Sequence, residues 1–231
     1  MSNIIQSLWI GPSLTIMEQM SIKSFLKNGH EYHLYTYGDV ANIPEGTIVK
    51  DGNEILPASE IYRYKTGSVS AFSNLFRFTM LYKKGGYWVD TDMICVKPFK
   101  LDNEYIIPTE PDAEYSYNRI TSSFLKMPKG SKVALKGIEI QKHFKKKILS
   151  GEIVWSAGPQ CVKMLVEMFK LEKFLLNWNA ICSCNYLDIE TLLQTKVKKS
   201  SKIISNVNEI PNNMLCIHLW HECWSRENID K

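Results

Sequence analysis

The feature that most constrains the fold is a long apolar segment that two glycines interrupt and two carboxylates end. Residues 70–84 are apolar on nearly every side of a helical wheel, which predicts a buried helix. Gly85 and Gly86 then turn the chain into a short hydrophobic strand that carries Asp90 and Asp92. Because alternate side chains of a strand share a face, the two carboxylates are expected roughly 5–7 Å apart.

Two carboxylates at this spacing repel each other by about 2–3 kcal/mol at an effective dielectric of about 20. A divalent cation beside them removes that repulsion, and oxygen ligands suit Mg²⁺ or Mn²⁺. Asp90 and Asp92 therefore predict a site for a metal that binds a diphosphate. The alternative is that the pair caps the end of a strand and binds nothing.

The first 40 residues predict a strand, a helix and a second strand. Residues 4–10 are mostly apolar and lead into a Gly-Pro turn, after which Ser13 is placed to cap a helix that runs to Lys27. Gly29 follows the helix, and residues 32–37 indicate a second strand. This unit is typical of an α/β protein in which helices flank a mainly parallel sheet.

Ligands of such sheets bind beyond the carboxyl ends of the strands. Trp9, Tyr37 and the aspartate pair are all predicted at that edge, so they are candidates for binding substrate. Arg77 lies three residues after Asn74, on the same face of the predicted buried helix. A buried arginine needs a partner, and both a structural salt bridge and a contact with a sugar or phosphate are open for Arg77.

The second half of the chain gives weaker patterns. Residues 104–108 indicate a strand, and residues 111–128 are mixed, as in loops that face an acceptor. The turn at 156–159 is expected to open a helix over 160–169, with Pro159 near its first position. Residues 214–220 indicate a last strand.

The length of 231 residues fits a single domain. Residues 1–100 are expected to form the half that binds nucleotide sugar and metal, and residues 101–231 the half that faces the acceptor and closes the site. The net charge of +4 permits an anionic ligand or a membrane surface, and no nucleic-acid-binding motif is present. We expect a cytoplasmic location, because we find neither a signal peptide nor an apolar run long enough to span a membrane.

Two basic runs, Lys142–Lys147 and Lys196–Lys202, are expected to be solvated faces or, alternatively, to dock on anionic lipid at the cytoplasmic face of the membrane. The six cysteines show no framework spacing and are expected to be free thiols. A zinc site is a minor alternative. It would use Cys182, Cys184, Cys216, His218, His221 and Cys223.

Three segments together resemble glycosyltransferases of the GT-A type, and more narrowly the retaining, DXD-containing group called glycosyltransferase family 32. They are residues 8–11, the block 73–99 that contains Asp90-Thr91-Asp92, and Gly158-Pro159 with the later residues 217–220. The group includes transferases of bacterial capsule and lipopolysaccharide as well as Golgi enzymes. The resemblance spans most of the chain and implies a GT-A fold.

The resemblance also implies roles for individual residues. Trp9 would stack on the nucleotide base, Arg77 would touch the donor sugar or its phosphate, and Asp92 would ligate Mn²⁺ or Mg²⁺. Asp90 would contact ribose, sugar or metal. The residues that would border the sugar pocket or close the site are Gly158, Pro159, His218 and Trp220, with His218 as a metal ligand or a diphosphate contact. The family usually has an aspartate where this chain has Asn74, which puts donor preference in question.

The function implied is that of a metal-dependent, retaining glycosyltransferase. It would move a hexose from a nucleotide sugar, expected to be UDP-linked, to a glycan or glycolipid in surface polysaccharide biosynthesis. The sequence offers no nucleophile, which favours attack on the same face as the leaving phosphate. Two alternatives remain open: a glycoside hydrolase that uses both carboxylates, and a module that binds sugar or nucleotide without turnover.

Overall fold

The computed structural model describes residues 4–112, 118–181 and 212–221. The helices are α1 (Ile16–Lys27), α2 (Ser70–Lys84), α3 (Lys132–Ser150) and α4 (Ala157–Phe169), with short 3₁₀ turns η1 (Gly52–Glu54), η2 (Ala58–Glu60), η3 (Glu172–Phe174) and η4 (Trp178–Ala180). The strands are β1 (Ile5–Leu8), β2 (Tyr32–Thr36), β3 (Ile48–Asp51), β4 (Gly86–Val89), β5 (Met93–Cys95), β6 (Ile107–Pro111), β7 (Asn118–Ile120), β8 (Phe124–Met127), β9 (Leu175–Leu176) and β10 (Cys216–His218).

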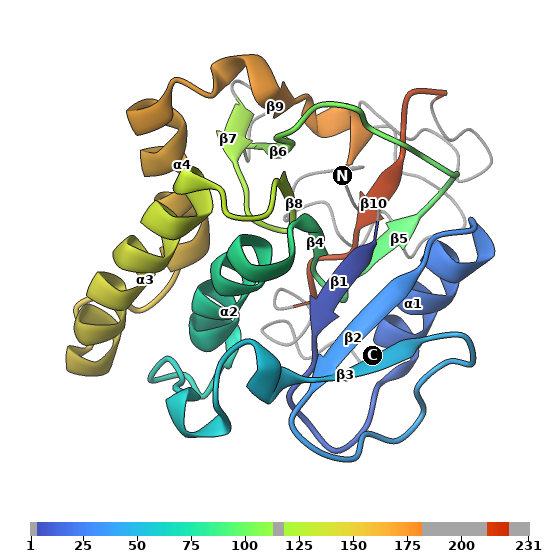
Figure 1. Ribbon diagram of the computed structural model, residues 1–231, viewed down its shortest axis with the longest axis horizontal. Helices are drawn as coiled ribbons and strands as arrows, with labels where there is room; N and C mark the ends of the chain where they lie inside the picture. The colour runs from blue at the N-terminus through green and yellow to red at the C-terminus, as the bar shows by residue number, and fades with distance from the viewer. Residues whose placement is uncertain (1–3, 113–117, 182–211, 222–231) are drawn as a thin grey trace.

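The central sheet has the strand order β3-β2-β1-β4-β8 (Figure 1). The first four strands are parallel, and β8 closes the sheet as an antiparallel edge against β4. Two smaller sheets, β10-β5 and β7-β6-β9, extend it. This single mixed α/β domain with a mainly parallel sheet confirms the fold class predicted from the sequence.

Helices cover both faces of the sheet, and each face has its own apolar core. Leu8, Tyr35 and Trp88 pack on the side of α2, α3 and α4. Ile5 and Val89 pack on the other side against α1. β1 and β4 therefore send alternate side chains into two cores, as expected for strands that are buried on both faces.

The α2 helix has the bounds that its apolar pattern predicts, Ser70–Lys84. Gly85 ends it with φ 69°, and Gly86 follows with φ 87°. A Cβ at Gly85 would approach the Lys129 backbone nitrogen to 2.6 Å, so both the turn and the packing require glycine here.

The prediction that Asp90 and Asp92 lie on one strand is wrong. β4 ends at Val89 and β5 begins at Met93, so the three residues Asp90-Thr91-Asp92 form a turn between two strands that belong to different sheets. The Asp90 amide donates to the carbonyl of Ser123 at 2.8 Å, which ends the pairing of β4 with β8. The two carboxylates consequently have separate surroundings.

Several predicted boundaries also shift. The α1 helix begins at Ile16 rather than after Ser13, because Thr15 and Glu18 form its capping box. The α4 helix begins at Ala157 rather than Gln160, which a proline in the first turn allows because the amides there have no helical partner. The strand expected at 104–108 lies at Ile107–Pro111, and the last strand is limited to Cys216–His218.

Three elements, β3, β8 and α3, were not predicted from the sequence. The α3 helix nevertheless carries a recognisable apolar stripe in Val133, Ile140, Phe144 and Ile148, with Ser131 as its N-cap. The basic residues of Lys142–Lys147 interrupt that stripe in the sequence but lie mostly on the outer face of the helix.

Some predictions concern residues outside those that the structure describes: Cys182, Cys184, Cys223 and the run Lys196–Lys202. The cysteines that it does describe, Cys95, Cys161 and Cys216, are buried free thiols. Within the described ranges, no helix combines the length and apolar character needed to cross a membrane.

Candidate active site

A cavity of about 620 Å³ opens at the carboxyl ends of β1 and β4. Its volume lies within the range typical of small-molecule sites. It brings together residues that the sequence analysis selected from four distant segments: Trp9, Asn74, Arg77, Asp90, Asp92, Gly158, Pro159, His218 and Trp220. Only one predicted site residue is missing from its lining.

That residue is Tyr37. Its hydroxyl donates to the carbonyl of Leu56 at 2.7 Å, and its ring packs against Phe72 and Phe76. β2 ends at Thr36, so Tyr37 already belongs to the connection that leads to β3. The structure places its side chain beside α2, away from the cavity.

Asp90 is held from one side by two donors. Its Oδ1 accepts a hydrogen bond from Trp88 Nε1 at 2.7 Å and lies 3.1 Å from Arg77 Nη2. The Arg77 guanidinium also stacks over the Trp88 ring at 4.9 Å and donates to the Ser122 carbonyl. Both roles left open for Arg77 are therefore compatible, since its salt-bridge partner is itself a cavity residue.

Burial raises the pKa of Asp90 above its usual value, and the positive charge of Arg77 opposes that shift. Burial likewise lowers the pKa of Arg77, and the negative charges of Asp90 and Asp92 oppose it. Each group thus depends on the other for its charge, and a cation that enters beside Asp90 would further favour the carboxylate.

Asp92 is contacted from the C-terminal segment. Its Oδ2 accepts a hydrogen bond from the backbone amide of His221 at 2.9 Å and lies 3.4 Å from Nε2 of His218. Burial would raise the pKa of Asp92, but the charge and hydrogen bond of His218 and the His221 amide together lower it to about 2. Asp92 is therefore an ionised carboxylate throughout the neutral range.

The residues of this turn fit a divalent cation. Asp92 Oδ1 is buried and, among the described residues, has no hydrogen-bond partner, which a cation would supply. No three His, Cys, Asp or Glu side chains of the described residues are arranged to hold a metal by themselves. Mg²⁺ and Mn²⁺ sites that bind nucleotides commonly take one or two carboxylates from the protein and the rest from phosphate and water.

Aromatic rings border the cavity at two places. Trp9, at the end of β1, donates from Nε1 to the Ser13 carbonyl at 3.1 Å, which fixes the plane of its ring. On the opposite segment, Trp220 lies against His218 with ring centroids 4.1 Å apart and has a left-handed backbone with φ 56°. A positive φ is uncommon for a non-glycine residue.

Gly158 leaves room for polar groups at the start of α4. A Cβ there would collide with Oδ1 of Asn74 and would lie 2.6 Å from Oγ of Ser122. The absence of a side chain at Gly158 thus lets an amide and a hydroxyl meet at the cavity wall, a pattern suited to sugar hydroxyls.

Other cavity residues were not predicted from the sequence, among them Glu110, Arg119, Ser122, Trp155 and His221. Glu110 is buried and lies 3.0 Å from Arg119 across the β6–β7 pair, and burial raises its pKa. No local pattern marks these positions, because the pairing of β6 with β7 and the course of the C-terminal segment bring them to the site. Only Trp88, two residues before Asp90, could have been selected from its spacing.

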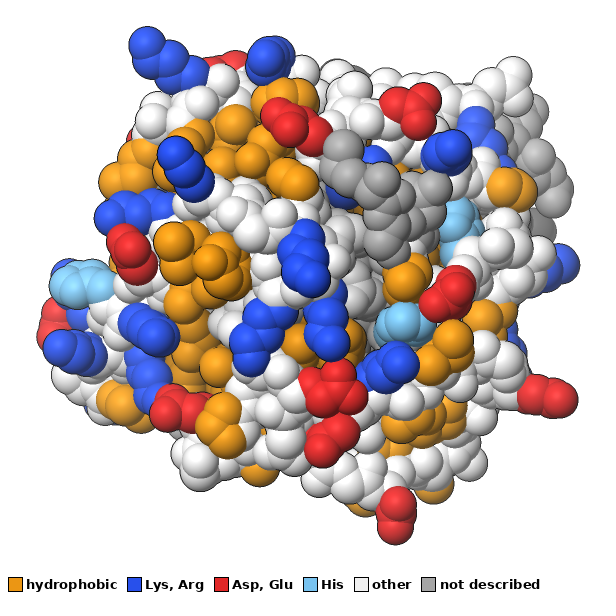
Figure 2. All heavy atoms as spheres, viewed as in Figure 1, with side chains coloured by type: hydrophobic (Ala, Val, Ile, Leu, Met, Phe, Trp, Pro, Cys, Tyr) orange, Lys and Arg blue, Asp and Glu red, His pale blue; other side chains and the backbone are white. Residues whose placement is uncertain are grey.

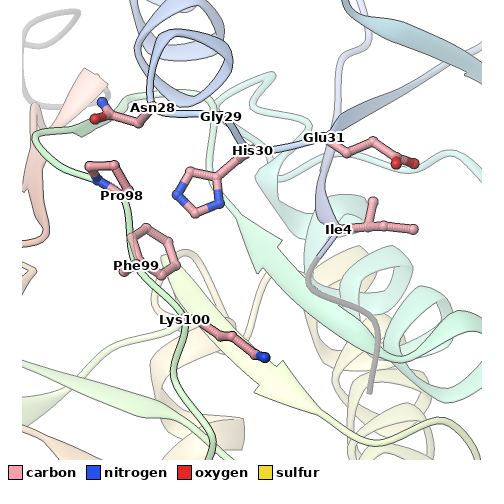
Figure 3. Close-up of a pocket in the computed structure, with 8 residues that line it drawn as sticks. All are labelled: Ile4, Asn28, Gly29, His30, Glu31, Pro98, Phe99 and Lys100. Atoms are coloured by element: carbon pink, nitrogen blue, oxygen red, sulfur yellow. The ribbon is translucent and has the colours of Figure 1, made fainter.

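A second cavity, of about 540 Å³, lies near the amino ends of β1 and β2 (Figure 3). His30 and Phe99 face each other there with ring centroids 4.4 Å apart. Its one carboxylate, Glu31, lies 2.6 Å from His33. None of the residues that the sequence analysis selected lines this cavity.

The chain thus combines a parallel sheet, an acidic turn at the carboxyl edge of that sheet and a cavity beside the turn. Residues 17–112 match the family model described as "Glycosyltransferase sugar-binding region containing DXD motif". Its DXD motif in this chain is Asp90-Thr91-Asp92. The match confirms the predicted resemblance to DXD-containing glycosyltransferases, while the narrower assignment to glycosyltransferase family 32 stays a prediction.

Among solved structures, the chain is similar to "PaToxG Glycosyltransferase", with a TM-score of 0.54 and 14% sequence identity. The likeness covers 74% of this chain and 71% of that chain. At this identity it shows the shared fold. A comparison with curated proteins gives no match.

Gly158→Ala should impair the site without impairing the fold, because alanine is compatible with a helix but its methyl group would displace Asn74 and Ser122. We expect binding of a nucleotide sugar to weaken at least about tenfold, measured by isothermal titration. Lys163→Ala, on the exposed side of α4, is the control. Unchanged affinity in the glycine variant would show that this wall does not contact the ligand.

Proposed function

We propose that this chain is a metal-dependent, retaining glycosyltransferase that moves a hexose from a UDP-linked sugar to a glycan or glycolipid acceptor in surface polysaccharide biosynthesis. The observation that carries the proposal is the Asp90-Thr91-Asp92 turn at the cavity, with Arg77 beside it. The match of residues 17–112 to a DXD sugar-binding region supports the choice of substrate class.

We assign each wall of the cavity to one part of the donor. Asp92 would ligate the metal, with Asp90 contacting ribose, sugar or metal and His218 contacting metal or diphosphate. When bound, the metal would take up negative charge as the bond between sugar and phosphate breaks. Arg77 would hold the donor sugar or phosphate, Trp9 the base, and the Asn74–Gly158 wall the sugar hydroxyls.

Retention would follow from attack by the acceptor on the face that the diphosphate leaves, with a leaving phosphate oxygen accepting the acceptor's proton. Among the described residues, the cavity has one further carboxylate that could instead act as a nucleophile, Glu110, but its Oε1 lies 3.0 Å from Arg119. An ion-paired carboxylate is a weaker nucleophile, which favours same-face attack.

Glu110→Gln tests this assignment, since the amide keeps the shape of the side chain and removes its nucleophilic charge. Same-face attack predicts that kcat falls by no more than about tenfold, whereas loss of a nucleophile costs several orders of magnitude. Mass spectrometry of the wild-type protein after rapid quenching provides the second readout. A glycosyl adduct on Glu110 would exclude same-face attack.

The metal and nucleotide are tested by thermal unfolding with UDP, GDP or CMP, each with and without Mn²⁺. A ligand at about 100 times its Kd stabilises the folded state by about 2.7 kcal/mol, which corresponds to a rise in Tm of roughly 5–10 °C for a chain of this size. We expect this rise with UDP only when Mn²⁺ is present.

Asp92→Asn should abolish that Mn²⁺-dependent rise and lower transferase activity at least about 100-fold. Asp102→Asn is the matched control, because it makes the same chemical change at an exposed position outside the cavity. Stabilisation by no nucleotide, or near-normal activity of the Asp92 variant, would refute the metal-diphosphate site. Sugar release without any nucleotide would indicate the hydrolase.

We also propose that the protein acts in the cytoplasm and docks on the anionic face of the membrane through α3. Lys142 and Lys146 are exposed on this helix together with Leu135 and Leu149, the latter 59% exposed. Figure 2 shows Lys and Arg side chains gathered beside hydrophobic ones on the side of the molecule where α3 lies. Exposed lysines around apolar side chains fit a surface of anionic lipid.

The charge reversal Lys142→Glu with Lys146→Glu should weaken binding to vesicles of phosphatidylglycerol and phosphatidylcholine by at least about tenfold, since each lysine near such a surface contributes about 1 kcal/mol. Co-sedimentation at low and high salt measures the effect. Lys23→Glu with Lys27→Glu, on exposed positions of α1, is the control for net charge. Equal loss in both variants would contradict docking through α3.

A further inference from the structure

A polar stripe on α1, buried at Glu18 and Ser21 and half-buried beyond them, faces the acidic turn and the strand that follows it. Ser21 Oγ donates to the Met93 carbonyl at 2.6 Å, and Ser24 Oγ accepts from the Cys95 amide at 2.8 Å. Asn28 Nδ2 lies 3.1 Å from the Cys95 carbonyl. These residues recur at helical spacing, so one face of α1 and its C-cap residue are hydrogen-bonded to β5. Figure 1 shows the helix beside that strand.

Glu18 is the first member of this stripe, and its side chain is fully buried. Oε2 accepts from the backbone amide of Thr15 at 2.7 Å and from the Thr15 hydroxyl at 2.6 Å. The other oxygen, Oε1, lies 2.9 Å from Nδ1 of His221. Burial alone would raise the pKa of Glu18, but its contacts with His221 and Thr15 outweigh burial and lower it.

At 2.9 Å the carboxylate and the imidazole are in direct polar contact, although the geometry is not that of a hydrogen bond. This contact restricts the positions open to the His221 ring. The backbone amide of the same residue donates to Asp92 Oδ2 at 2.9 Å, and the amide of Leu219 donates to the Asp92 carbonyl at 2.9 Å. Glu18 is thus connected to the DXD carboxylate through a single residue.

We propose that Glu18 is a positioning residue for Asp92, acting through His221. By fixing the His221 ring, Glu18 keeps the His221 amide on Oδ2 of Asp92 and leaves Oδ1 for the cation. This inference rests on the proposed metal-dependent function, and it gives the N-terminal helix a role in holding a metal ligand that the cavity lining alone does not reveal. Carboxylates that orient metal sites from outside typically contribute 10- to 100-fold in metal affinity.

The test measures Mn²⁺ binding directly, by electron paramagnetic resonance of free Mn²⁺ in the presence of UDP or GDP. Glu18→Ala should weaken Mn²⁺ binding about tenfold or more and raise the metal concentration needed for half-maximal activity more than it lowers kcat. Thr15→Val is the matched control, because it removes a hydrogen bond to the same carboxylate but leaves the contact with His221. It should bind Mn²⁺ as the wild type does.

Glu18→Gln provides rescue. Its amide oxygen can accept from Thr15, and its NH₂ group can donate to Nδ1 of the His221 ring where that nitrogen is unprotonated. We expect this variant to retain most of the wild-type Mn²⁺ affinity, and it keeps the test decisive if Glu18→Ala fails to fold. A Glu18→Gln variant as weak as Glu18→Ala would contradict orientation of the His221 ring by a polar contact from position 18.

His221→Ala completes a double-mutant cycle, since it removes the ring and keeps the backbone amide. If Glu18 acts through His221, the double variant binds Mn²⁺ no more weakly than the weaker of the two single variants. Losses that multiply would show that Glu18 only caps its helix. Wild-type affinity in Glu18→Ala would overturn this inference alone, whereas a wild-type protein that binds no Mn²⁺ with either nucleotide would overturn the proposed function with it.

Discussion

The site depends on the contact between Arg77 and Asp90. Arg77 is 3% exposed in a helix that is otherwise apolar, and a guanidinium in that position is stable only with a fixed anion beside it. Asp90 supplies that anion, while Trp88 provides both a ring for the guanidinium and a hydrogen bond to the carboxylate. Because the Arg77 guanidinium also donates to the Ser122 carbonyl, this one side chain connects α2 with the DXD turn and with the segment before β8.

The second aspartate is organised in a different way. Asp92 belongs to a turn whose outgoing strand, β5, pairs with β10 from the far end of the chain. Its partners are therefore C-terminal residues, and α1 holds β5 from the other side. Asp90 is therefore held by residues of the sheet and α2, whereas Asp92 is held by the C-terminal segment that contains β10. A metal-diphosphate ligand would contact both parts.

How far the sequence could predict this arrangement depends on whether each feature is local. The α2 helix was predictable because a helix buried on nearly every side requires a nearly continuous apolar segment. Its end was predictable because two consecutive positive φ values favour the two glycines that the sequence shows. Asp90 and Asp92 were predicted as a pair, but spacing of two residues fits a turn as well as a strand, and the pairing of β5 with β10 that decides between them joins distant segments. Glu18 resembles an ordinary solvent-facing helix residue in the sequence, because the residue that contacts its carboxylate, His221, is about 200 positions away.

The charges in the cavity explain why asparagine suits position 74 better than aspartate. The cavity already contains the carboxylates of Asp90, Asp92 and Glu110 against two guanidinium groups, Arg77 and Arg119. An aspartate at position 74, as the resembled family usually has, would add a negative charge one helical turn from Arg77, where that cation is already bound to Asp90. Asparagine keeps the hydrogen-bonding shape at the Gly158 wall and avoids that competition. The cost is one carboxylate fewer at this wall of the cavity, so under the proposed function discrimination between sugars would depend more on hydrogen-bond direction than on charge.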